Sequence, residues 1–190
     1  VVIVPIFKND DELSKISEKA EALMTGLRKP GLSVKFDNRD TQKPGFKFAE
    51  YEMRGVPVRI AIGPRDIQNG TVELARRDTK EKSVVKLEEV TGLIPGLLDN
   101  IQKNLYDRAL KFRQEKTTSV DTYEEMKKVL DGKGGFVMAH WDGTPETEAA
   151  IKEETKATIR CIPLDAPEEN GKCVYSGKPS KRRVAFARAY

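Results

Sequence analysis

One short stretch of the chain carries a ring, a carboxylate and two guanidinium groups, at Phe48, Glu52, Arg59 and Arg65. The Watson–Crick edge of guanine presents an N1–H and a 2-amino group, which a single carboxylate can accept together. Its O6 and N7 atoms are two acceptors that match the guanidinium fork. An aromatic ring adds a surface on which an unpaired base can stack. These residue types therefore predict a pocket for a guanine of single-stranded nucleic acid.

The same residues also have a simpler interpretation as ion pairs. Two acidic and two basic side chains lie close together in the sequence, at Glu50, Glu52, Arg54 and Arg59. Exposed pairs of this kind contribute under about 1 kcal/mol each and bind nothing. Spacing alone favours the ion pairs over a base-binding pocket.

Residues suited to catalysis are sparse. His140 is the sole histidine, and no neighbouring residue suggests a partner for a nucleophilic relay. The glycine-rich run at residues 132–135 contains a lysine but lacks the order of a phosphate-binding loop. We therefore expect a structural His140 and no catalysis by this chain alone.

The elements around the candidate pocket follow from hydrophobic spacing. Residues 46–54 form two helical turns, and Gly55 is placed for a left-handed cap. Residues 56–62 alternate as a strand with one buried face, which leaves Arg59 and Ala61 on the other face. Residues 63–66, Gly-Pro-Arg-Asp, are predicted to form a turn. The pocket should lie at this helix–strand corner.

The remaining pattern predicts an α/β domain followed by a smaller α+β domain. The first comprises a strand at 1–7, a helix at 10–27 and strands at 33–37, 71–75 and 83–90. Helices are then expected from 97 and at 121–130 and 146–156, and strands at 136–141, 158–164, 173–176 and 184–189. We divide the chain into an α/β domain over 1–95, a helical connector over 96–132 and an α+β domain over 133–190.

Composition narrows the class of protein. The 190 residues carry a net charge of +4 and a pI near 8.9, which suits contact with selected phosphates. Two cysteines make no disulfide framework, so a reducing cytoplasm is expected. No apolar run approaches the ~18 residues of a membrane span. The opening segment resembles a buried strand, not a signal peptide, and its lack of Met suggests a piece of a longer protein.

The string "PGFKFAEYEMRGVPVRIAIGPRDIQNGTVELARRDT", residues 44–79, resembles the anticodon-binding domain of prolyl-tRNA synthetases of the archaeal and eukaryotic type. It follows the pattern P-G-x-K-F-x-E-x-E-x-x-G-V-P-x-R-x-x-x-G-P-[RK]-D of that family. The likeness continues through "VDTYEEMKKVL", "EETKATIRCIP" and "RRVAFARAY", and so covers almost the whole chain.

The resemblance implies a five-stranded mixed sheet flanked by helices, and a set of residues that read the two guanines of the proline anticodon. In this set Phe48 stacks on a base or shapes the pocket, and Glu52 accepts from a guanine Watson–Crick edge. Arg59 and Arg65 donate to base or backbone oxygens. Glu50 and Arg77, in the same block, are further candidates.

The resemblance also implies partners. The chain would be the C-terminal part of a cytoplasmic, dimeric class II ligase that joins proline to tRNA(Pro) with ATP and Mg²⁺. This part would bind tRNA without catalysing ligation, because the catalytic domain lies outside it. Tyr190 would contact that missing domain. Two alternatives stay open: a stand-alone RNA-binding or regulatory module, and an interaction scaffold that binds no RNA.

Many members of the family hold zinc through four cysteines, spaced C-x4-C and C-x2-C. The matching positions here are Asp142, Thr147, Cys173 and Ser176, whereas Cys161 matches a cysteine that is not a ligand. One thiolate, one carboxylate and two hydroxyls are a poor donor set for structural zinc. We therefore expect no zinc, no other cofactor in this chain, and a small domain held by packing and hydrogen bonds.

Overall fold

The computed structural model describes residues 1–189 and divides into two units, Val1–Asp107 and Arg108–Tyr190. Helix α4 (Val90–Glu115) spans the division. The expected boundaries at residues 95 and 132 stay a prediction. Among the described residues, no helix combines the length and the apolar composition that a membrane crossing requires.

The first unit is built on a five-stranded mixed sheet in the order β2-β1-β3-β4-β5. The strands are β1 (Val2–Pro5), β2 (Lys35–Phe36), β3 (Val58–Ile62), β4 (Thr71–Arg76) and β5 (Lys82–Lys86). Strand β1 pairs in parallel with β2 and β3, whereas β3, β4 and β5 pair antiparallel. The structure thus confirms the predicted fold class.

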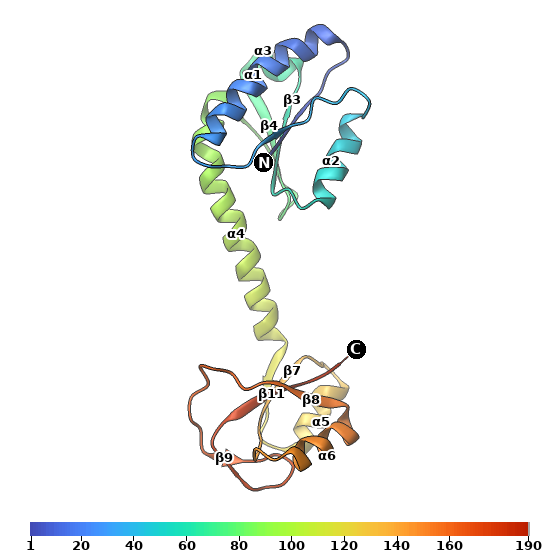
Figure 1. Cartoon of the computed structure of the whole chain (residues 1–190), viewed down its shortest axis with the longest axis vertical. Helices are drawn as coiled ribbons and strands as arrows, with labels where there is room; N and C mark the ends of the chain where they lie inside the picture. Colours follow the sequence, from blue (N-terminus) through green and yellow to red (C-terminus); the bar gives the residue numbers. More distant parts are fainter. Residues whose placement is uncertain (190) are drawn as a thin grey trace. The chain divides into compact units, whose positions relative to one another are not determined.

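Helices cover the two faces of this sheet unequally. Helix α1 (Asp10–Arg28), capped by the Asn9 side chain, and the first turns of α4 share one core with Ile60 and Leu74. Helix α2 (Pro44–Met53) packs on the opposite face through Tyr51, against β1. Figure 1 shows α1 and α2 on opposite sides of the strands.

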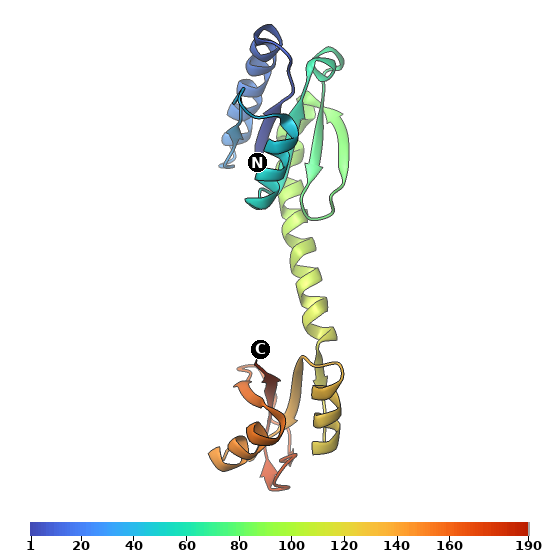
Figure 2. The ribbon, with the colours of Figure 1, turned by 90° about the vertical axis from the view of Figure 1, so that its right-hand side faces the viewer.

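The β4–β5 hairpin forms the edge of the sheet beside α2, as Figure 2 shows. On its uncovered face Glu73 lies opposite Val84, and Ala75 lies opposite Lys82. Val84 is 69% exposed. An open sheet face next to a helix therefore remains available for a ligand.

The second unit has a four-stranded sheet in the order β6-β7-β11-β8. Its strands are β6 (Thr117–Ser119), β7 (Phe136–His140), β8 (Ala157–Cys161) and β11 (Arg183–Arg188), and its helices are α5 (Tyr123–Asp131) and α6 (Pro145–Thr155). A two-stranded sheet joins β9 (Gly171–Lys172) to β10 (Pro179–Ser180). Phe186, Met126 and Ile151 are fully buried in its core.

Three predicted elements were wrong. Residues 63–66 begin a short helix, α3 (Pro64–Asn69), because Pro64 stands at its first turn and Asp66 bonds the Gly63 N–H at 2.8 Å. The strand expected at 83–90 ends at Lys86, and a 3-10 turn leads into α4 at Val90. Residues 173–176 form a turn and not a strand.

Candidate nucleic-acid interface

The corner between α2 and β3 is set by local structure. Pro44 begins α2, and Gly55, with a φ of 78°, closes its end. The Val56 N–H then donates to the Tyr51 carbonyl oxygen at 3.0 Å, and the chain turns into β3. Phe48 and Glu52 are four residues apart, so both lie on the same face of the helix.

This corner contains a cavity of about 310 Å³, here called the α2–β3 cavity. Its lining includes Phe48, Glu52, Arg59, Arg77, Lys80 and Lys82. Four of the six predicted site residues therefore come together. Glu50 and Arg65 are not in its lining.

Arg59 lies flat against Phe48, its guanidinium carbon 3.4 Å from the ring centroid. Its Nη2 is 3.2 Å from Glu73 Oε1, and its side chain is only 12% exposed. Burial lowers the pKa of Arg59, while the charges of Glu73 and Glu52 act in the opposite direction. Its Nη1 is buried and has no hydrogen-bond partner among residues 1–189. One nitrogen of the guanidinium, with two N–H groups, is therefore left without an acceptor.

Glu52 also lines the cavity, is exposed and is ion-paired with Lys80. The hydrogen bond from Lys80 lowers the pKa of Glu52, which keeps the side chain a carboxylate at neutral pH. The Glu52 carbonyl oxygen accepts from Arg77 Nε at 2.8 Å. The carboxylate is thus a charged acceptor whose partner is a solvent-exposed lysine.

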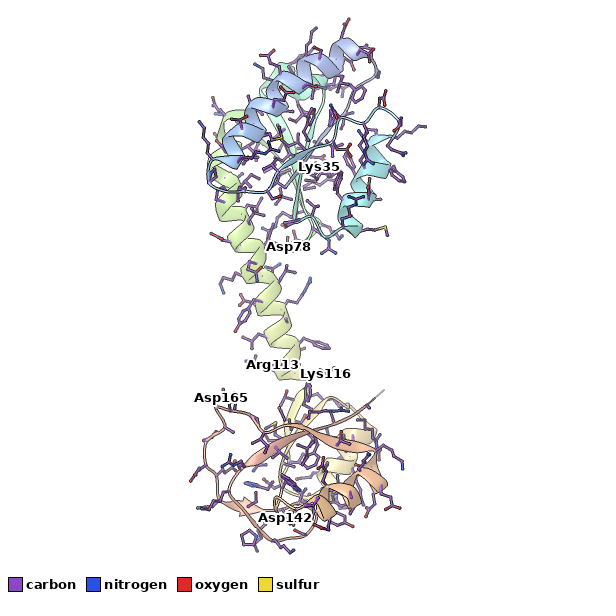
Figure 3. The ribbon with its side chains drawn as sticks, viewed as in Figure 1. Lys35, Asp78, Arg113, Lys116, Asp142 and Asp165 are labelled. Atoms are coloured by element: carbon purple, nitrogen blue, oxygen red, sulfur yellow. The ribbon has the colours of Figure 1, made fainter. Side chains whose placement is uncertain are left out.

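The β4–β5 turn that supplies Arg77 and Lys80 is anchored from two sides. Asp78 accepts from Arg76 Nη2 at 2.8 Å and from Asn104 Nδ2 at 2.7 Å. Lys80 adopts a left-handed φ of 65°. Figure 3 labels Asp78 at this turn. Sequence reasoning missed Lys80, because a lysine in a polar turn carries no signal that it faces a glutamate 28 positions earlier.

Glu50 belongs to a separate ion-pair cluster. Its carboxylate is 2.5 Å from Arg39 Nη2 and 2.6 Å from Arg54 Nη2. These contacts fit the ion-pair interpretation, and its role as a base reader stays a prediction. Arg65 is exposed in α3, after the carboxyl end of β3, whereas Arg59 is the second residue of that strand.

Beneath this cluster lies a lysine that sequence reasoning also missed. Lys47 is 1% exposed, and its Nζ donates to the carbonyl oxygens of Asp37 and Arg39. The buried Asp37 carboxylate accepts from Arg39 Nε at 2.8 Å and Nη2 at 2.7 Å. These contacts fix residues 37–43 against α2. A lysine on a helix is ordinarily exposed, so the residue type alone predicted a surface position for Lys47.

Asp37 makes the stability of the first unit depend on acid. Its hydrogen bonds from Arg39 lower its pKa from 3.8 to about 2, against the opposing effect of burial. The unfolded chain binds the proton first, so this stabilisation is complete above pH 3.8 and is lost as pH falls through about 2.

We expect Asp37→Asn to remove this contribution, about 2 kcal/mol at neutral pH. The difference in unfolding free energy between wild type and variant should then shrink between pH 5 and pH 2. Urea titrations followed by amide hydrogen exchange in β1 and α2 measure it. A difference that does not change with pH would contradict the assignment.

In the second unit His140 is buried, which fits the structural role predicted for it. Its ring is 3% exposed and packs against Gly171, with Nδ1 3.1 Å from Ser180 Oγ. Tyr190, predicted to contact the missing catalytic domain, lies outside the described residues.

Comparisons with known proteins agree with the two units. Residues 1–97, slightly over half of the chain, match the family described as "Anticodon binding domain", and residues 123–190 match "Prolyl-tRNA synthetase, C-terminal". The chain is 58% identical over 190 residues to a proline–tRNA ligase of Flavobacterium johnsoniae and 56% identical to one of Porphyromonas gingivalis.

These matches cover 100% of this chain but only 39% and 38% of the two relatives. A proline–tRNA ligase of Amoebophilus asiaticus is 51% identical, with 39% of its length covered. The chain belongs to the anticodon-binding domain family, in the form that continues into the C-terminal domain of prolyl-tRNA synthetases.

Proposed function

We propose that this chain recognises the guanines of the tRNA(Pro) anticodon, as the C-terminal part of a proline–tRNA ligase. The observation that carries the proposal is the α2–β3 cavity, whose lining includes the Glu52 carboxylate and the Arg59 guanidinium. A volume of about 310 Å³ lies at the lower end of the range for small-ligand sites, ~300–1,000 Å³, which suits one base.

Within this cavity each side chain has a distinct task. Glu52 accepts hydrogen bonds from the N1–H and the 2-amino group of guanine. Arg59, which lines the cavity, donates to O6 and N7. Phe48 already stacks on Arg59, so its task is to hold the guanidinium flat and not to stack on the base itself.

Binding requires Lys80 to change partners. In the free protein Lys80 is ion-paired with Glu52, the acceptor that the base needs. Both side chains are more than half exposed, so the pair is weak and readily opened. Once displaced, Lys80 and the neighbouring Lys82 lie beside the cavity and can bind the phosphates that flank the base.

The rest of the reaction belongs to the part of the ligase outside this chain. That part would bind proline, ATP and Mg²⁺ and would charge the tRNA in the cytoplasm as a homodimer. Arg65, at the other end of β3, would contact the RNA beyond the cavity, and Tyr190 the catalytic domain. These statements rest on the match to the C-terminal part of the ligase family.

A titration with anticodon hairpins tests the proposal. The wild-type chain is titrated with a hairpin that carries the two guanines and with one in which adenine replaces each guanine, at one fixed salt concentration. We expect adenine to weaken binding by about tenfold or more, because adenine lacks the N1–H and 2-amino donors that Glu52 accepts from in guanine. Equal affinities would contradict base recognition and favour the scaffold, or a module that binds RNA without reading its bases.

A further inference from the structure

The carboxylate of Asp142, just after β7, is the centre of a hydrogen-bond cluster in the second unit. Its Oδ1 accepts from the N–H and the hydroxyl of Thr144, at 3.1 and 2.9 Å. Its Oδ2 accepts from Thr147 Oγ1 at 3.0 Å and from Ser176 Oγ at 2.6 Å. Burial raises the pKa of Asp142, but the hydrogen bonds from Ser176 and Thr144 together lower it to about 2.

Three members of this cluster occupy positions where relatives were expected to carry zinc-binding cysteines: Asp142, Thr147 and Ser176. The donor chemistry does not fit zinc. Both oxygens of Asp142 already accept hydrogen bonds, and the two hydroxyls use their protons as donors to it. The fourth position, Cys173, is buried, and one thiolate alone does not make a structural site. Among residues 1–189 no group of three metal-ligating side chains is found.

The cluster joins segments that are far apart in the sequence. Asp142 lies two residues after β7, Thr147 lies in the first turns of α6, and Ser176 lies in the turn between β9 and β10. That turn is closed by Gly177, with a φ of 70°, whose N–H donates to the Cys173 carbonyl oxygen at 2.9 Å. Linking such segments is the task of a structural metal ion in a small domain.

We propose that the Asp142 carboxylate takes the place of a structural metal ion in the second unit. One fixed negative charge with four donors replaces one cation with four ligands. The two arrangements have opposite polarity and share three positions, Asp142, Thr147 and Ser176, while Thr144 supplies the other two donors to the carboxylate. The proposal concerns the second unit alone and is independent of RNA recognition by the first.

The first test asks whether the carboxylate, and no metal, holds this unit. Trp141 is the sole tryptophan, and its Nε1 donates to the Thr144 carbonyl oxygen, so its fluorescence reports on this region. Asp142→Asn should lower the melting temperature seen by Trp141 by roughly 4–8 °C or more, since the amide loses the charge and cannot accept from all four donors.

Asp165→Asn is the matched control. Asp165 is exposed in the loop after β8, and Figure 3 shows it at the opposite end of the unit from Asp142. This variant should melt like wild type, and EDTA should leave the wild-type melting temperature unchanged. A fall in melting temperature with EDTA, or equal stability of the two variants, would overturn the proposal.

The second test restores the metal. Combining Asp142→Cys, Thr147→Cys and Ser176→Cys with the native Cys173 gives four thiols at C-x4-C and C-x2-C spacing. We expect this variant to bind one Co²⁺ with the absorption bands of tetrahedral thiolate coordination and to regain the stability lost in Asp142→Asn. Wild type should show no such bands. A variant that binds no Co²⁺, whether folded or not, would contradict the equivalence of the two arrangements.

Discussion

A Glu52→Gln variant is expected to bind the guanine-containing hairpin about tenfold or more weakly than wild type. The amide oxygen can accept one hydrogen bond, but its NH₂ group faces the second guanine donor and repels it. Losing a hydrogen bond to a charged acceptor costs about 1.5–3 kcal/mol, which corresponds to roughly 10- to 150-fold in affinity. Lys80 adds no compensating gain, because its exposed pair with Glu52 is weak.

The specific signature is the response to inosine, which lacks only the 2-amino group of guanine. Wild type should prefer guanine over inosine, whereas Glu52→Gln should lose most of this preference. Fluorescence anisotropy with the two hairpins at one salt concentration measures both affinities.

Glu88→Gln is the control, because it removes the same charge from an exposed position of the first unit outside the cavity. If both variants changed affinity equally and kept the guanine preference, the effect of Glu52 would be long-range electrostatics and not base recognition.

Hydrophobic spacing was sufficient to predict most elements of the first unit. It placed Arg59 on the face of β3 away from the α1 core, as the structure confirms. The prediction of a single buried face was wrong, because Ala61 on the Arg59 face is only 2% exposed. Hydrophobic spacing also failed where an element is too short for a period to appear. The six residues of α3 look like a turn, although Pro64 and Asp66 are both helix-start signals. The strand-like pattern of residues 83–90 likewise continued past Lys86, where β5 ends.

The candidate site was predictable only in part. The motif brought together Phe48, Glu52, Arg59 and Arg77, since they lie on one helix–strand corner and the adjoining turn. The missing members come from tertiary contacts. Lys80 faces Glu52 only because β4 and β5 place their turn beside α2. Lys47 is buried only because residues 37–43 fold over it and offer two carbonyl oxygens.

Lys47 also carries the largest expected effect on stability. Lys47→Met keeps a straight side chain of similar length but removes the ammonium that satisfies the carbonyl oxygens of Asp37 and Arg39. Removing one partner from a buried ionic contact costs roughly 3–5 kcal/mol. We expect a loss near the lower value, about 3 kcal/mol, because Asp37 keeps its two hydrogen bonds from Arg39.

Lys43→Met is the control, since Lys43 is exposed at the start of the same helix. Urea unfolding followed by amide exchange in α2 should show a large loss for Lys47→Met and almost none for Lys43→Met. Burial lowers the pKa of Lys47, which means that the wild type already bears a free-energy cost for burying the ammonium. Lys47→Met removes this cost together with the two hydrogen bonds, so the measured loss of stability is the difference between the two. If Lys47→Met were as stable as wild type, the cost of burying the ammonium would equal the stabilisation that its two hydrogen bonds contribute. The fixed position of α2, and with it Glu52, would then need another cause.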